Sequence, residues 1–380
     1  MNILSRAEAL APGLYGIRER IHRHPEIGNS EFETAALVEK ILHSLGITTR
    51  RVTETGIVGE LSGAYPGPIA AVRADMDALP VTEASGAPFS SEIPGMMHAC
   101  GHDVHTTAVL GAAMLLSEVR DRLHGTVRFF FQPDEEGSGG ARRMIDAGCM
   151  DGVEAVFGAH VAPDLPEGVI GVRYGKFYAA SDMFDVTIHG VSAHGAQPEK
   201  GRDALAAGAA IVSELRRLPS KLIADPAVLT TGTFQAGTAR NIIADKADFT
   251  GIIRTLGPDD RACLNRAFRD TVAEISAQFG VQPEIRIMGS YAGIVNSDTE
   301  TALVQKTAEA LFGSDQVRVI DRPLMISEDF GYFIDAAKGS FYHIGAGCSV
   351  PLHSPDFLPA PCTIIRLAAL HADIIGQYLF

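Results

Sequence analysis

The chain has 380 residues, enough for roughly two or three domains of ordinary size. Its composition, with 46% hydrophobic and 21% charged residues, is typical of a globular protein and excludes a mainly disordered chain. A formal charge of −14 disfavours nucleic acids and anionic membranes as partners, because both are negatively charged.

The cysteines and the apolar segments predict a reduced, cytoplasmic location. Five cysteines at irregular spacing do not form a disulfide framework. Residues 1–16 carry Arg6 and Glu8 within their only apolar stretch, so they lack the apolar core of a signal peptide. The longest uncharged apolar segment, Thr106–Ser117, is too short to cross a bilayer. In such a protein, a cysteine near histidines is a candidate metal ligand.

The first half of the sequence alternates short apolar runs with helical segments, which predicts an α/β domain with a parallel or mixed sheet. Expected strands include 69–72, 127–131 and 155–158, and expected helices include 103–119 and 141–147. Each of these strands is followed directly by ionisable or Gly/Pro-rich residues. Loops at the carboxyl ends of strands gather side chains from several strands, so the ligand site is expected at this edge of the sheet.

A second block follows the pattern β-α-β-β-α-β, which is typical of a ferredoxin-like unit. Strands are expected at 184–189, 228–235, 246–255 and 282–288, and helices at 202–218 and 258–279. Long α/β elements resume after this block. We therefore predict a discontinuous catalytic domain, residues 1–181 and 294–380, with an inserted domain at residues 182–293.

The densest group of possible metal ligands is the segment 98–105. Gly101 lets the backbone turn sharply, so the thiolate of Cys100 and the imidazole of His102 can face one metal ion. Considered alone, the segment is equally compatible with a polar loop.

The other polar residues of this segment are expected to have structural roles. Asp103 is expected to be the N-cap of the following helix. His98 and His105 are expected at the surface.

Three adjacent acidic residues, Asp134, Glu135 and Glu136, follow the Phe-rich strand. Adjacent carboxylates repel each other unless a cation or a proton relieves the repulsion. We predict that one glutamate binds metal while its neighbour, directed the other way, acts as a general base on water. The alternative is a solvated acidic turn, which is a common feature.

Two further histidines complete the set of possible ligands. His160 lies at a strand end, where a single histidine is usually a satisfied polar residue. His353 lies between Pro351 and Pro355, which restrict the backbone and reduce the entropy cost of holding its ring. Together with the earlier residues, they would suit two divalent first-row ions, bridged by Cys100 or a carboxylate.

The inserted domain contains two polar segments with open roles. His194, in Ser192-Ala193-His194-Gly195, is either a functional residue or part of a surface turn. Arg240-Asn241 lies between two expected strands, where it either binds a substrate carboxylate or forms a hairpin turn.

Six motifs occur in order along nearly the whole chain: His22-Arg23-His24-Pro25-Glu26, Arg73-Ala74-Asp75-Met76-Asp77-Ala78-Leu79-Pro80, His98-Ala99-Cys100-Gly101-His102-Asp103, Gln132-Pro133-Asp134-Glu135-Glu136-Gly137, Ser192-Ala193-His194-Gly195 and Ser327-Glu328-Asp329-Phe330. Together they resemble the amidohydrolase family of hippurate hydrolases, auxin-conjugate hydrolases and N-acyl-amino-acid deacylases. That family is a branch of the aminoacylase and glutamate-carboxypeptidase metallopeptidases.

The resemblance implies a zinc-peptidase-like catalytic domain with a ferredoxin-like lid or dimerisation domain. It implies two divalent ions per subunit (Zn, Mn, Co or Ni), bound by Cys100, His102, Glu136, His160 and His353. Glu135 matches the catalytic base of this family.

The resemblance also implies roles for residues outside the ligand set. His194 matches the lid histidine that polarises the scissile carbonyl, often across a dimer, and Asn241 lies where relatives hold the substrate. The related carboxypeptidases have a His-x-Asp pair where this chain has Asp75-Met76-Asp77, so Asp75 cannot be assumed to be a ligand. His102 is expected to take the place of that histidine.

The implied reaction is hydrolysis of the amide bond of N-acyl amino acids, of acetyl, benzoyl or indolylacetyl type, by a homodimer or homotetramer. One alternative is a dipeptidase or carboxypeptidase with the same dinuclear site. Another is a binding protein that keeps the fold without catalysis, which the complete ligand set and Glu135 argue against.

Overall fold

The computed structural model describes residues 2–380, which divide into two compact units. Unit 1 comprises the residues up to Gly175, Asn296–Arg322 and Asp329–Phe380. Unit 2 comprises Lys176–Val295 and the short segment Pro323–Glu328. The expected insertion, residues 182–293, lies within unit 2.

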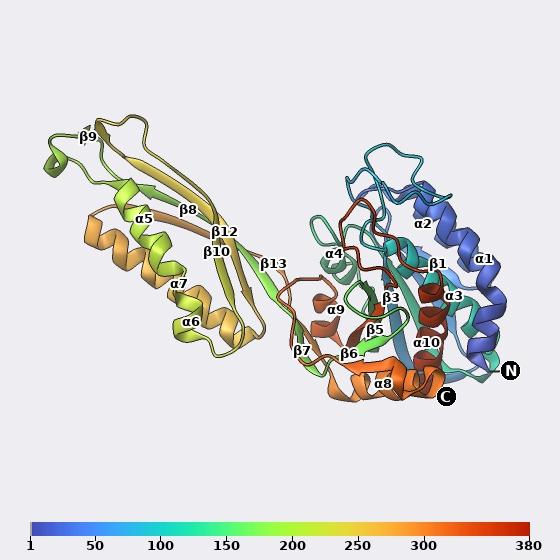
Figure 1. Cartoon of the computed structure of the whole chain (residues 1–380). Coiled ribbons are helices and arrows are strands. Elements are labelled where there is room, and N and C mark those ends of the chain that lie inside the picture. The colour runs from blue at the N-terminus through green and yellow to red at the C-terminus, as the bar shows by residue number, and fades with distance from the viewer. Residues whose placement is uncertain (1) are drawn as a thin grey trace. The chain divides into compact units, whose positions relative to one another are not determined.

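Unit 1 is built on a mixed eight-stranded sheet with the order β1-β2-β4-β3-β5-β16-β6-β15 (Figure 1). Its strands are β1 (Thr48–Arg51), β2 (Ile57–Ser62), β3 (Tyr65–Asp75), β4 (His124–Gln132), β5 (Val153–Ala162), β6 (Ile170–Val172), β15 (Val317–Val319) and β16 (Lys338–Gly345). The neighbouring strands β4, β3, β5 and β16 are all parallel, so their carboxyl ends lie along one edge. This is the α/β class with a mixed sheet that the alternating pattern predicts.

Helices cover both faces of this sheet (Figure 1). They are α1 (Ile3–Arg23), α2 (Phe32–Ser44), α3 (His102–Ser117), α4 (Gly140–Asp146), α8 (Asp298–Phe312), α9 (Gly331–Ala336) and α10 (Cys362–Leu379). Helices α3 and α10 pack on each other and on β3, with α1 against both, while α4 and α9 pack together on the opposite face. Helix α3 is buried on nearly all sides, which explains its long uncharged apolar run. Among residues 2–380, none of the helices combines the length and apolar character that crossing a bilayer requires.

The Phe-rich strand β4 shows how the core is filled on both faces of the sheet. Phe129 and Phe131 belong to the core cluster that includes residues of α3 and α10, whereas Phe130 stacks on Phe333 of α9 with ring centroids 5.5 Å apart. Because side chains alternate along a strand, a strand buried on both faces has a continuous apolar sequence.

Unit 2 contains an antiparallel four-stranded sheet with the order β10-β12-β8-β13. Its elements are β8 (Ala180–His189), α5 (Ala204–Leu215), α6 (Leu218–Leu222), β10 (Val228–Ala236), β12 (Lys246–Thr255), α7 (Pro258–Phe279) and β13 (Gln282–Tyr291), followed by the short strand pairs β9 (Ala193–His194) with β11 (Ile242–Ile243) and β7 (Gly175–Tyr178) with β14 (Ile294–Asn296). The main elements follow the order β-α-β-β-α-β. Strand β8 begins at Ala180 rather than at residue 184. Its first three residues are all buried, so they lack the alternation that predicts a strand, and the buried Asp182 carboxylate accepts hydrogen bonds from Arg261.

Candidate metal centre

The carboxyl ends of the four parallel strands bring ionisable residues of unit 1 together. Asp75 ends β3, Glu135 and Glu136 follow β4, His160 lies near the end of β5, and His353 lies in the loop after β16. Helix α3 starts at the same edge. The site therefore forms where loops from neighbouring parallel strands meet.

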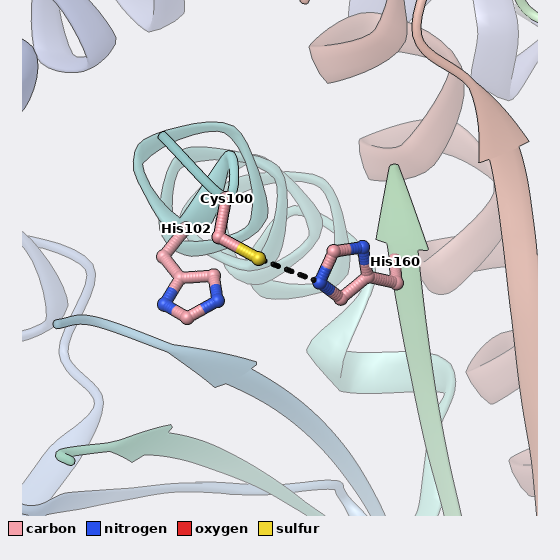
Figure 2. Close-up of side chains that lie close together, drawn as sticks. All are labelled: Cys100, His102 and His160. Carbon is pink, nitrogen blue, oxygen red and sulfur yellow. Dashed lines mark hydrogen bonds between the residues drawn. The ribbon is translucent and has the colours of Figure 1, made fainter. Parts of the chain in front are cut away.

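Two groups of potential ligands share the thiol of Cys100. One group adds His102 and His160, the other adds Glu136 and His353, and within each group the ligand atoms lie within 4.8 Å of one another. The thiol donates a hydrogen bond to Nε2 of His160 at 3.4 Å (Figure 2). Nε2 of His353 lies 3.0 Å from Oε1 of Glu136. The structure thus brings together all five residues that were expected as ligands.

His102 and His160 are oriented by bonds at the ring nitrogen that faces away from the thiol. Nδ1 of His102 donates to the backbone oxygen of Asp77 at 2.9 Å, and Nδ1 of His160 donates to the carbonyl of Val161 at 2.7 Å. The remaining Nε2 of His102 is buried and has no hydrogen-bond partner within residues 2–380. A bare imidazole nitrogen, oriented by the opposite N–H, is how histidine ligands are usually held.

The electrostatics of the site favour a bound cation. Burial lowers the pKa of His102, but the carboxylates of Asp75 and Asp77 outweigh it and raise the pKa to about 10. Burial and the nearby Glu136 carboxylate raise the pKa of the Cys100 thiol well above its usual value. The surrounding carboxylates thus stabilise a positive charge in the site, either a proton or a metal ion. A metal ion would also displace the proton of the Cys100 thiol. This mixed N, O and S donor set fits two divalent cations.

The two glutamates after β4 lie in a tight turn that begins with Asp134, whose φ is +55°. The Asp134 carboxylate accepts a hydrogen bond from Nδ2 of Asn29 at 2.8 Å, which helps to hold this left-handed conformation. Carboxylate oxygens of Glu135 and Glu136 both come within 4.8 Å of the His102 ring nitrogen. The expectation that these glutamates point in opposite directions is therefore wrong, because they lie in a turn and not in an extended segment.

Gly101, and not Asp103, is the N-cap of α3. Gly101 has φ of +86°, and a Cβ there would lie 2.5 Å from Cγ2 of Val161, so only glycine fits. The Asp103 carboxylate instead accepts a bond from Nε of Arg18 at 2.6 Å and contacts Nδ1 of His22 at 2.8 Å. The predicted cap was wrong because buried cationic groups compete for this carboxylate.

His98 and His105 are 1% and 2% exposed, so their expected surface positions are also wrong. His105 is bound at both nitrogens: Nδ1 contacts Oδ1 of Asp75 at 2.7 Å, and Nε2 accepts the backbone N–H of Val161 at 3.0 Å. Because α3 starts beneath the loops of the site, these loops cover His105, which lies one turn into the helix. Local spacing does not reveal this enclosure.

Asp75 and Asp77 contact the site histidines, a role that was not predicted. Asp77 lies 3.2 Å from Nδ1 of His102 through Oδ1 and accepts the backbone N–H of Glu136 at 3.0 Å through Oδ2. Asp75 forms an ion pair with Nη1 of Arg73 at 2.7 Å. The sequence feature that could have revealed this role is the pair of carboxylates, separated by one residue, at the end of a buried strand.

The two functional residues predicted in the inserted domain lie side by side in unit 2. Strands β9 and β11 pair His194 with Ile242, and the backbone N–H of Gly195 donates to the carbonyl of Asn241 at 2.8 Å. Both side chains are exposed. Nδ1 of His194 accepts the N–H of Ala196 at 3.1 Å, so the neutral ring carries its proton on Nε2.

Comparison with known proteins establishes the family. Residues 71–375 match the sequence profile of Peptidase family M20/M25/M40. The chain belongs to this family. It is accordingly a hydrolase, as the resemblance implied.

Characterised and structurally solved relatives of this M20/M25/M40 member cover nearly its whole length. The N-acetyl-L-cysteine deacetylase of Bacillus subtilis (strain 168) is 36% identical over 357 residues, covering 93% of this chain and 85% of that protein. Thermostable carboxypeptidase 2 of Saccharolobus solfataricus is 37% identical over 366 residues, covering 93% and 92%. The crystal structure of the Bacillus subtilis YXEP protein, a dinuclear metal binding peptidase of family M20, matches with a TM-score of 0.87 at 33% identity and covers 98% and 99% of the two chains.

Proposed function

We propose that the protein hydrolyses the amide bond of N-acyl amino acids, releasing a carboxylic acid and a free amino acid. The observation that carries this proposal is a cluster of N, O and S donors next to a second carboxylate, in a member of a hydrolase family. The donors are Cys100, His102, Glu136, His160 and His353, and the carboxylate is Glu135. Similarity to an N-acetyl-L-cysteine deacetylase supports an acetyl group as the acyl group. The benzoyl and indolylacetyl types are those that the family resemblance implies.

The five donors would hold two divalent cations, and Cys100 belongs to both groups of ligand atoms. His102 and His160 would complete one position, and Glu136 and His353 the other. When bound, such cations supply Lewis acidity, which polarises a carbonyl group and lowers the pKa of water. Zn, Mn, Co and Ni all accept mixed donors of this kind.

Glu135 is the general base in this proposal. Its side chain is only 6% exposed, and a carboxylate oxygen lies within 4.8 Å of the ligand atoms of Glu136 and His102. From there it can accept a proton from the attacking water and later return that proton to the leaving amine nitrogen. The base is thereby regenerated in each turnover.

In unit 2, His194 would donate its Nε2 proton in a hydrogen bond to the scissile carbonyl oxygen, and Asn241 would bind the substrate. The bond that Nδ1 accepts from Ala196 supports this role, because it leaves the proton on the outward nitrogen. The histidine would act in its own chain or in a partner subunit.

We further propose a homodimer or homotetramer in the cytoplasm. Strand β10 lies at an edge of the unit 2 sheet, so it offers unpaired backbone groups for a second copy, and half of its side chains are exposed. A reduced compartment suits the Cys100 thiol, which must remain unoxidised to bind metal.

The substrate class can be tested with metal-reconstituted protein. N-acetyl, N-benzoyl and N-indolylacetyl amino acids are compared with unblocked dipeptides by kcat/KM. We expect turnover of the N-acyl compounds to be faster. A preference for unblocked dipeptides would favour a peptidase role, in line with the carboxypeptidase relative, and no turnover by protein with two bound metals would contradict the proposal.

A further inference from the structure

His22, the first histidine of the N-terminal motif, has no part in the proposed reaction, yet its side chain is completely buried. His22 lies in the last turn of α1, where Nδ1 is 2.8 Å from Oδ2 of Asp103 and Nε2 is 3.1 Å from Oε1 of Glu83. Burial lowers the pKa of His22, but the two carboxylates outweigh it and raise the pKa overall. A protonated ring donates to both carboxylates at once, so His22 joins two segments of chain that are 20 residues apart.

The first of these segments is the start of α3. Asp103 directly follows His102, and the same carboxylate oxygen, Oδ2, also accepts a bond from Nε of Arg18 at 2.6 Å. Arg18 in turn packs over the ring of Phe89, 4.5 Å from its centroid. Helix α1 therefore restrains the backbone from which His102 reaches into the ligand set.

The second segment is part of the long loop between β3 and α3. Glu83 is held there by His22 and also accepts hydrogen bonds from the Ser85 hydroxyl and the backbone N–H of Ser91. The next residue, Ala84, donates its backbone N–H to the carbonyl of Pro355 at 2.8 Å. Pro355 lies two residues after His353. The segment held by Glu83 therefore supports the loop that carries the last ligand.

We propose that His22 is a positioning residue of the metal centre, linking the start of α3 to the loop of His353. This inference rests on the proposed function, because it takes His102 and His353 to be ligands. Its effect falls mainly on His353, whose side chain is 51% exposed and whose backbone has φ of +65°. His102 is also held by Asp77, so it depends less on His22.

The test measures metal affinity rather than activity. Metal-free protein is titrated with Zn²⁺ in competition with a chromophoric chelator, and His353→Ala identifies which binding step belongs to the His353 position. Glu83→Ala removes the contact of His22 with the loop, together with the bonds that Glu83 accepts from two serines of the loop, and keeps the pairing of His22 with Asp103. We expect Glu83→Ala to weaken the step that His353→Ala abolishes by about 10- to 100-fold and to leave the other step unchanged. Ser85→Ala, which removes only bonds within the loop, is its control and should retain wild-type affinity at both steps.

His22→Gln should weaken the same step, since the amide has donors on one nitrogen only and would direct its carbonyl oxygen, which is an acceptor, at the other carboxylate. His43→Gln is the matched control, because His43 is an exposed histidine of α2 whose ring bonds only to Thr49 among the hydrogen bonds of residues 2–380. The His43→Gln protein should bind Zn²⁺ with wild-type affinity in both steps. Thermal unfolding of each metal-free variant checks folding, and if His22→Gln does not fold, Glu83→Ala decides.

Two results would overturn the inference. Folded Glu83→Ala with wild-type affinity at both steps, or with equal losses at both, would show that the loop contact does not position His353. A wild-type chain that binds no divalent cation would instead overturn the metal centre itself, and the positioning role with it.

Discussion

In unit 1 the proposed ligands Cys100, His102 and His160 are at most 6% exposed, whereas in unit 2 the side chains of His194 and Asn241 are exposed. The ligands are oriented by buried carboxylates and backbone carbonyls. The unit 2 pair rests on the two-residue strands β9 and β11, with one backbone bond to the His194 ring. The ligand side chains of the first region are therefore oriented within the chain itself, while the side chains of the second region are open to solvent.

This difference has a physical consequence for catalysis. A hydrogen bond strengthens when water is excluded, so His194 needs a further surface or a bound substrate around it to act strongly on a carbonyl. The buried ligands need only a cation. We therefore expect changes in unit 1 to abolish metal binding or chemistry, and changes in unit 2 to affect catalysis while metal binding is retained.

The largest effect is expected from Glu135→Gln. The amide keeps the size of the side chain but cannot accept a proton, so kcat should fall by about 10²- to 10⁴-fold while two metals stay bound. Glu136→Gln should lose metal and activity together. Metal analysis and steady-state kinetics distinguish the two, and a Glu135→Gln protein that keeps half of its kcat would contradict the role of this residue as base.

His194→Ala tests the exposed region. Loss of a hydrogen-bond donor to the developing oxyanion should lower kcat by about 10²- to 10³-fold, with metal content unchanged. His189→Ala, which removes another exposed histidine of unit 2, is the control and should remain active. Loss of bound metal in His194→Ala would contradict the expectation that changes in unit 2 affect catalysis while metal binding is retained.

Mixing two inactive variants shows which chain supplies the histidine. If His194 acts in a partner subunit, a mixed dimer of His194→Ala and Glu135→Gln has one intact site, and activity should recover to roughly a quarter of wild type with half of the dimers mixed. If it acts within its own chain, each site keeps one defect and no activity returns. Native mass spectrometry verifies the exchange of subunits.

Removal of the metal should change the reactivity of Cys100. A coordinated thiolate resists alkylation, whereas the metal-free thiol, which is buried and has a raised pKa, should react measurably with a small reagent at alkaline pH. Chelation should also abolish activity until divalent ion is restored. Peptide mass analysis follows the modification, with the exposed Cys263 as an internal control that reacts equally in both states. Equal alkylation of Cys100 with and without metal would exclude it as a ligand.

The smallest effect on function is expected from His371, a buried histidine of α10 that bonds to Tyr342. Burial, with a smaller contribution from His105, lowers its pKa from 6.5 to about 3. The unfolded chain therefore binds more protons between these values, so stability should fall as the pH drops from 6.5 towards 3. In metal-free protein, denaturant titrations of His371→Gln should show a weaker dependence on pH over this range at unchanged activity at neutral pH, and an unaltered dependence would contradict the assignment.

The sequence by itself determined the fold class and the identity of the residues that meet at the site. Strand 246–255 and helix 258–279 were predicted at their observed bounds, because alternation and helical spacing act within short stretches of chain. Cys100, His102, Glu136, His160 and His353 were candidates because their residue types suit metal binding at strand ends and in loops, and the family resemblance assigned them as the ligand set.

Tertiary structure alone decided how these residues are held. The partners of His102, His105 and Asp103 are Asp77, Asp75 and Arg18, which lie 25 to 85 residues away in the sequence. The left-handed turn at Asp134 likewise depends on Asn29, 105 residues earlier. Such contacts form only when distant segments pack together, and burial then makes an unsatisfied carboxylate or imidazole costly enough to override local preferences such as capping.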